Sequence, residues 1–141
     1  MSLEVESLLR VLLAAGLGAV IGFEREKANK PAGLRTHILI GMGSALFTVV
    51  SIYGFGGTAD PARIAAGVVT GIGFIGAGVI FRGMRGDKVM GITTAASIWI
   101  TAAIGIAAGC GLYIIAAVSA LVTLLVLLIP CLLYTSDAAD E

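Results

Sequence analysis

The stretch VVTGIGFIGAGVIF, from Val68 to Phe81, decides the fold of this chain. It contains no Lys, Arg, Asp or Glu, and it belongs to a longer uncharged run between Arg63 and Arg82. A helix needs about 20 apolar residues to cross the ~30 Å hydrocarbon layer of a membrane. The run has that length, so we expect a transmembrane helix over roughly Ile64–Phe81.

The same stretch spells the glycine motif of a dinucleotide-binding loop, at Gly71, Gly73 and Gly76. That loop needs a preceding strand, a following helix, and an acidic residue about 20 positions further on. Ala96 stands where the acid belongs, and the surrounding apolar runs are too long for the strands of such a unit. We therefore predict no nucleotide cofactor and assign these glycines to helix packing.

The composition places the whole chain in a membrane. It is 58% hydrophobic and 13% charged, with a mean hydropathy of +1.04, whereas a soluble domain has about 45–50% apolar and 25% charged residues. The net charge of zero argues against a nucleic-acid partner. The sequence predicts an all-α domain of five transmembrane helices over residues 1–130, surrounded by the lipid bilayer. The other four helices are expected at roughly Leu8–Phe23, Thr36–Tyr53, Gly91–Ala108 and Leu112–Ile129.

The distribution of Lys and Arg predicts the orientation of the domain. Seven of these residues lie in the segments 24–35 and 82–90, against two, Arg10 and Arg63, on the opposite side. Basic residues mark cytoplasmic loops, so we expect the N-terminus outside and the C-terminus in the cytoplasm. Pro130 is expected to end the last helix, and residues 131–141, with three acids and no base, are predicted to be a disordered or non-native tail.

Small residues occur on two sides of the third helix. At ~100° per residue, Gly67, Gly71 and Gly78 share one side, and Gly73 and Gly76 lie nearly opposite. Small residues let membrane helices approach closely. We therefore predict that this helix is central, between two neighbours, and that Leu at Gly71 or Gly76 disrupts the bundle.

Four-residue spacings of small residues also occur in the other helices. The first helix has Ala14, Gly18 and Gly22, and the second has Gly41 and Ala45. The fourth has a hydroxyl stripe, which either forms hydrogen bonds between helices or lines a small polar pathway. The residues of this stripe are Thr93, Ser97, Thr101 and Gly105.

The segment between the first two helices has the highest density of charge. The first helix is expected to end at Glu24, Arg25 and Glu26. The second is expected to begin at Arg35 and His37, with Thr36 as a candidate N-cap. One interpretation is an interfacial loop whose bases touch lipid phosphates. The other is an ion-pair cluster at the cytoplasmic mouth of the bundle, which holds a cation or docks a partner.

On the opposite side, Asp60 and Pro61 precede the third helix. Asp is a good N-cap, Pro favours the first helical position, and the acid complements the helix dipole. This structural role explains Asp60 without chemistry, and Arg63 is expected to pair with Asp60 or with another helix.

The chain offers no catalytic constellation. His37 is the only histidine, and Ser44 lies two helical turns from it, about 10 Å along the helix axis and out of hydrogen-bonding reach. No group of Cys, His, Asp or Glu has the spacing of zinc ligands. The sequence therefore predicts neither an enzyme nor a metal centre.

Three stretches of the chain together carry a family resemblance. From about residue 8 to residue 128 the chain resembles the N-terminal membrane domain of the MgtC/SapB family. The resemblance rests on the order and spacing of these stretches: Glu24-Arg25-Glu26 with Ala32-Gly33-Leu34-Arg35-Thr36-His37, then Asp60-Pro61-Ala62-Arg63 leading into Thr70–Ile80, and finally Gly91–Trp99.

The resemblance implies a bacterial inner-membrane protein of five helices. The family is associated with growth under magnesium limitation and, in pathogens, with virulence. It implies regulation of membrane partners, namely the F-type ATP synthase or ion-transport ATPases. The alternative function is a cation transporter or channel subunit that uses the Thr93–Thr101 stripe.

The resemblance also implies that a soluble cytoplasmic domain usually follows the last helix, so we expect this chain to be a fragment. Self-association into a homo-oligomer is left open. The polar positions carried over by motif are Glu24, Arg25, Glu26, Arg35, His37, Asp60 and Arg63.

Overall fold

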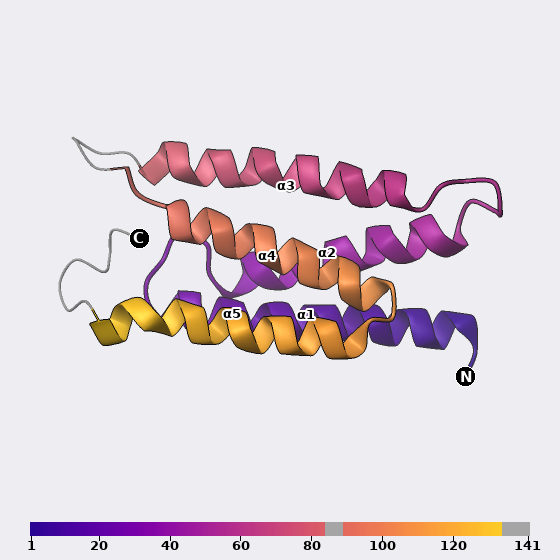
Figure 1. Cartoon of the computed structure of the whole chain (residues 1–141), viewed down its shortest axis with the longest axis horizontal. Coiled ribbons are helices and arrows are strands. Elements are labelled where there is room, and N and C mark those ends of the chain that lie inside the picture. The colour runs from indigo at the N-terminus through magenta and orange to yellow at the C-terminus, as the bar shows by residue number, and fades with distance from the viewer. Residues whose placement is uncertain (84–88, 134–141) are drawn as a thin grey trace.

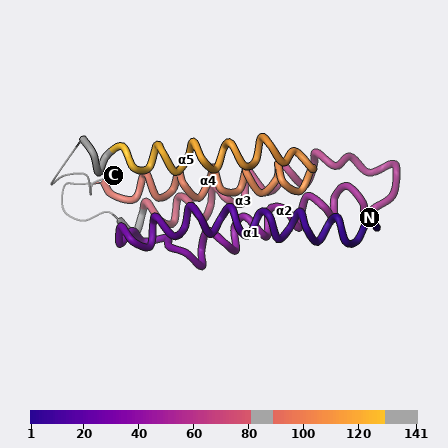
Figure 2. The backbone as a smooth tube through the Cα atoms, turned by 90° about the horizontal axis from the view of Figure 1, so that it is seen from below, coloured from indigo at the N-terminus to yellow at the C-terminus, as the bar shows by residue number. Residues whose placement is uncertain are grey.

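The computed structural model describes residues 1–83 and 89–133, and this part of the chain contains five α-helices and no strand. The helices lie lengthwise beside one another, with the N-terminus and the end of α5 at opposite ends of the bundle (Figure 1). Figure 2 shows the same alignment from a second direction. The helices are α1 (Leu3–Lys27), α2 (Leu34–Tyr53), α3 (Ala62–Gly83), α4 (Ile92–Gly109) and α5 (Tyr113–Leu133).

The length and apolar character of these helices confirm the predicted membrane fold. Four of the described helices are long and apolar enough to cross a membrane, and the segment Tyr113–Ile129 of α5 is apolar as well. The chain is a multi-pass membrane protein. The end that faces the cytoplasm stays a prediction, and Arg85, Lys88 and the tail 134–141 lie outside the described residues.

Two helices extend further than the sequence predicted. α1 begins at Leu3, where the Ser2 hydroxyl accepts a hydrogen bond from the Val5 N–H at 3.2 Å. At its other end α1 continues to Lys27, so residues 24–27 of the predicted charged loop form the last turn of a helix. α5 continues to Leu133 and does not end at Pro130, because a membrane helix can tolerate the backbone hydrogen bond that proline removes.

The centre of the bundle is formed by α1, α2 and α4, whose backbones touch. A Cβ atom added to Gly41 would lie 2.7 Å from the Ala14 carbonyl oxygen, and one added to Gly109 would lie 2.8 Å from the Ala45 carbonyl oxygen. Gly105 packs in the same way against the backbone of Gly41. Small residues give this close approach between membrane helices, so the spacings in α1, α2 and α4 are packing positions.

The prediction that α3 is the central helix is wrong. Only 11% of the α3 span is buried, against 50% of the α4 span. α3 packs on α4 and, less extensively, on α2, at the edge of the bundle (Figure 1). A Cβ added to Gly76 would touch Ala95 at 3.5 Å, whereas Gly67, Gly71, Gly73 and Gly78 face open space. Small residues permit a neighbour without requiring one.

Two glycines are required by the backbone at the ends of α4. Gly91, before the helix, has φ +88°, and Gly111, in the turn to α5, has φ +85°. Glycine adopts such positive φ values at no steric cost. The predicted turn after Gly109 is confirmed, because α4 ends there and α5 begins at Tyr113.

Candidate functional site

The candidate site is a polar cluster at the end of the bundle where α1 meets α2 and α4. Its first member, Arg25, is buried because α1 continues past the predicted loop boundary. The Arg25 Nε donates to Glu24 Oε1 at 3.1 Å, and the two side chains are 4% and 10% exposed. The Arg25 Nη1 atom is buried without a hydrogen-bond partner in the described part of the chain.

Glu26 connects the cluster to the start of α2. Its Oε1 accepts a hydrogen bond from the Leu34 N–H at 2.9 Å, and a carboxylate at this position also complements the helix dipole. The prediction that Thr36 caps α2 is wrong, because α2 begins at Leu34 with Gly33 at the cap position. The cap therefore comes from a neighbouring helix rather than from the local sequence.

His37 joins α2 to α4 inside the bundle. The side chain is fully buried, with Nδ1 at 2.9 Å from the Gly33 carbonyl oxygen and Nε2 at 2.9 Å from Ser97 Oγ. A carbonyl oxygen only accepts hydrogen bonds, so Nδ1 carries the proton. In the neutral ring Nε2 then accepts from the Ser97 hydroxyl, which has the Thr94 carbonyl oxygen at 2.8 Å as its alternative acceptor.

The hydroxyl stripe of α4 is part of the packed interior. Ser97 and Thr101 are buried, whereas Thr93 is only half-buried. The Thr101 hydroxyl donates to the Ser97 carbonyl oxygen at 2.7 Å, and in α2 the Thr48 hydroxyl donates to the Ser44 carbonyl oxygen at 2.8 Å. Both residues are buried, so their hydroxyls do not line an open space between the described helices.

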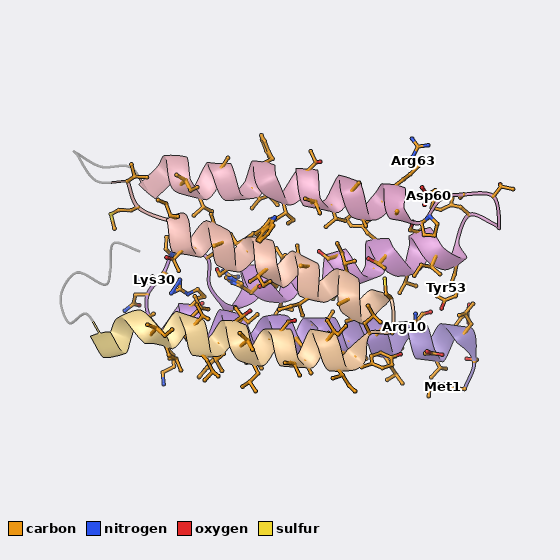
Figure 3. All side chains as sticks on the ribbon, viewed as in Figure 1. Met1, Arg10, Lys30, Tyr53, Asp60 and Arg63 are labelled. Atoms are coloured by element: carbon orange, nitrogen blue, oxygen red, sulfur yellow. The ribbon has the colours of Figure 1, made fainter. Side chains whose placement is uncertain are left out.

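A second polar cluster, at the opposite end of the bundle, was missed by the sequence analysis. Arg10 is buried and donates to Glu6 Oε2 at 2.7 Å, to the Gly109 carbonyl oxygen at 3.0 Å, and to the hydroxyls of Tyr113 at 3.1 Å and Tyr53 at 3.2 Å. Arg10 and Tyr53 lie together toward the N-terminal end of α1 (Figure 3). The signal in the sequence was the i, i+4 pair of Glu6 and Arg10 in an apolar helix.

Asp60 and Arg63 lie at this same end but belong to neither cluster. The Asp60 carboxylate accepts from the Ala62 N–H at 3.0 Å, which confirms its capping role at the start of α3. The prediction that Arg63 forms an ion pair is wrong for the described part of the chain, where its exposed side chain has no such partner. Arg35 is likewise exposed, so four of the predicted residues, Glu24, Arg25, Glu26 and His37, form the candidate site.

The cluster is suited to joining helices rather than to holding a metal. Among the side chains of residues 1–80 and 89–129, no three from His, Cys, Asp or Glu gather closely enough for a metal ion. The Glu26–Leu34 hydrogen bond joins α1 to the start of α2, and the His37–Ser97 hydrogen bond joins α2 to α4.

Comparison with known proteins identifies the family. The model of the MgtC family matches residues 11–133. The chain belongs to the MgtC family. The matched range includes Glu24, Arg25, Glu26 and His37 of the candidate site. Arg10 of the second cluster lies one residue before the matched range.

Curated relatives of this MgtC-family chain come from several bacteria. It is 52% identical to the Escherichia coli K12 protein named "Putative magnesium transporter YhiD", over 89% of this chain and 60% of that protein. It is 45% identical to Protein SrpB of Synechococcus elongatus, over 84% of this chain and 71% of that protein. It is 48% identical to Protein MgtC of Brucella abortus, over 73% of this chain and 42% of that protein. No solved structure matches the chain.

Proposed function

We propose that this chain is the membrane domain of a regulator in magnesium homeostasis that acts by contact with other membrane complexes. The partner class implied by the family resemblance is the F-type ATP synthase or an ion-transport ATPase. Membership of the MgtC family supports the link to magnesium, as does the name of the Escherichia coli relative. The chain spans about 60% of that relative's length. The regulatory activity that we propose is therefore that of a protein of the relative's full length.

The packing of the hydroxyl stripe is the observation that carries this proposal. A pathway for a hydrated cation would need polar groups around an open space. Here Gly41 and Gly109 bring the backbones of α1, α2 and α4 into contact, and the Thr48 and Thr101 hydroxyls are bonded within their own helices. This arrangement favours a rigid body that binds partners through its outer surface over a conduit.

A cation transporter is the second candidate, and the name of the Escherichia coli relative favours it. Such a path would lead from Asp60 at one end of the bundle to Glu24 and Glu26 at the other. It would require α4 to separate from α2, since the residues between them are closely packed.

Magnesium flux in liposomes separates the two functions. We expect vesicles that contain the purified chain to take up Mg²⁺ no faster than empty vesicles, and an ATPase subunit to be recovered by cross-linking in native membranes. Flux that is lost in Asp60→Ala and Glu26→Ala, but kept in the exposed control Glu4→Ala, would establish the transporter. Failure to recover any ATPase subunit would contradict the regulator.

A further inference from the structure

A wide apolar groove runs between α2 and α3, on the less buried side of the bundle. Its volume is about 740 Å³. Glycines widen it from both sides, because Gly43 of α2 and both Gly67 and Gly71 of α3 lack a side chain that would fill the space. Large apolar side chains form the remaining wall, among them Leu39, Ile40 and Phe47 of α2 and Ile64, Val68 and Ile75 of α3.

The length of the groove matches one leaflet of a bilayer. It extends along α3 from Arg63 to Ile75, which at 1.5 Å per residue is about 18 Å. Half of the ~30 Å hydrocarbon layer is about 15 Å. Beyond Ile75 the packing changes, because Gly76 approaches Ala95 of α4. The groove therefore begins in the first turn of α3 and ends about one turn past the middle of the α3 span, Ala62–Ile80.

A cation stands at the surface end of the groove. Arg63 lines this end, is exposed, and forms no ion pair in the described part of the chain. Figure 3 shows its side chain pointing outward from α3, on the side away from the other helices. The nearby Asp60 carboxylate is engaged by the Ala62 N–H. The guanidinium is thus available to an anion at the level of the lipid headgroups.

Shape and charge together select the occupant. An apolar groove open to a bilayer is filled by a lipid chain or by another helix, and apolar burial alone does not favour either one. A partner helix that crosses the membrane spans the whole ~30 Å hydrocarbon layer, nearly twice the length of this groove. A lipid tail occupies only one leaflet. The phosphate of the same lipid would lie near Arg63, whereas a partner helix has no phosphate to offer.

We propose that the α2–α3 groove is a binding site for an anionic phospholipid of the adjoining leaflet. One acyl chain lies along Gly43, Gly67 and Gly71, and the headgroup phosphate accepts hydrogen bonds from Arg63. The site is independent of the proposed regulatory function, since it requires no protein partner.

Photo-labelling tests this site directly. The chain is placed in phosphatidylcholine vesicles with a phosphatidylglycerol probe that carries a diazirine in mid-chain, and the labelled peptides are mapped. We expect label on residues 39–47 and 64–75. Gly71→Leu should abolish this label by filling the groove, whereas Gly73→Leu should keep it, because Gly73 also faces open space but does not line the groove.

The role of Arg63 is tested by charge. Arg63→Gln should lower labelling by the anionic probe about fivefold, the effect of one basic residue near a membrane surface. It should lower labelling by the matching phosphatidylcholine probe less, because the choline cation offsets the charge of the phosphate. Equal labelling of Gly71→Leu and the wild type would overturn the lipid site. A second outcome would also overturn it: the wild type forms a dimer whose groove is not labelled, and Gly71→Leu is a monomer. A second copy of the chain would then fill the groove. Circular dichroism of each variant confirms that the helices have formed.

Discussion

Two regions of this molecule have similar glycine spacings and different surroundings. In α1, α2 and α4, glycines such as Gly41 and Gly109 touch the backbone of a neighbouring helix. In α3, Gly67, Gly71, Gly73 and Gly78 touch nothing. The spacing of small residues therefore shows where a helix is able to approach another. Whether it does so depends on the neighbouring helices.

Substitution of Gly41 should have the largest effect on the packed region. The Cβ of Gly41→Leu would lie 2.7 Å from the Ala14 carbonyl oxygen, and overpacking of this kind costs about 3 kcal/mol or more when backbone must move. We expect a large fall in the thermal unfolding midpoint in detergent. Gly43→Leu is the matched control on the same helix, since Gly43 faces open space, and an equal fall in both variants would contradict the account.

Loss of Arg10 should have the next largest effect. Arg10→Leu leaves the Gly109 carbonyl oxygen without its charged donor and releases Tyr53 and Tyr113 from α1. A hydrogen bond to a charged group is worth about 1.5–3 kcal/mol, so we expect destabilisation in that range. Arg63→Gln, on the exposed side of α3, should leave the unfolding midpoint unchanged. An unchanged midpoint for Arg10→Leu would show that its contacts add nothing.

The hydrogen bond between His37 and Ser97 should contribute less. Such bonds between membrane helices are worth about 0.6–2 kcal/mol, and Ser97→Ala should destabilise the bundle by an amount in this range. A double-mutant cycle with His37→Ala isolates the pair. We expect the double variant to be more stable than the sum of the single effects predicts. Strict additivity would mean that the two side chains do not interact.

The outward face of α3 should tolerate substitution best. Gly78→Leu adds a side chain where a Cβ meets no atom within 4 Å, and substitutions at such surface positions change stability by about 0.5 kcal/mol or less. The unfolding midpoint should equal that of the wild type. A marked fall would indicate that the side of α3 that carries Gly78 packs against a neighbour.

The membrane fold followed from the sequence because charges are excluded from long spans. Charge-free runs placed all five helices, and Gly109 with Gly111 marked the turn between the last two. The relative positions of the helices did not follow from the sequence. Gly71 and Gly41 lie in similar patterns of small residues, and only the neighbouring helix distinguishes them. Packing between helices is a property of facing surfaces, which a single helix does not contain.

The candidate site was predictable in its residue types and only partly in its geometry. Glu24, Arg25, Glu26 and His37 were identified from their density of charge at a membrane boundary. Their positions depended on how far α1 continues, which turned Arg25 into the bundle and placed Glu26 at the start of α2. The cluster around Arg10 was missed because its partners, Tyr53 and Tyr113, come from distant parts of the sequence.

A single methyl group tests the difference between the two glycine regions most directly. The unfolding midpoints of Gly105→Ala and Gly71→Ala should be measured in the same detergent. Gly105→Ala should lower the midpoint, because the new methyl meets the backbone of Gly41. Gly71→Ala should keep or raise it, because alanine favours a helix by about 1 kcal/mol over glycine and the position is open. An equal fall in both variants would contradict the peripheral placement of α3.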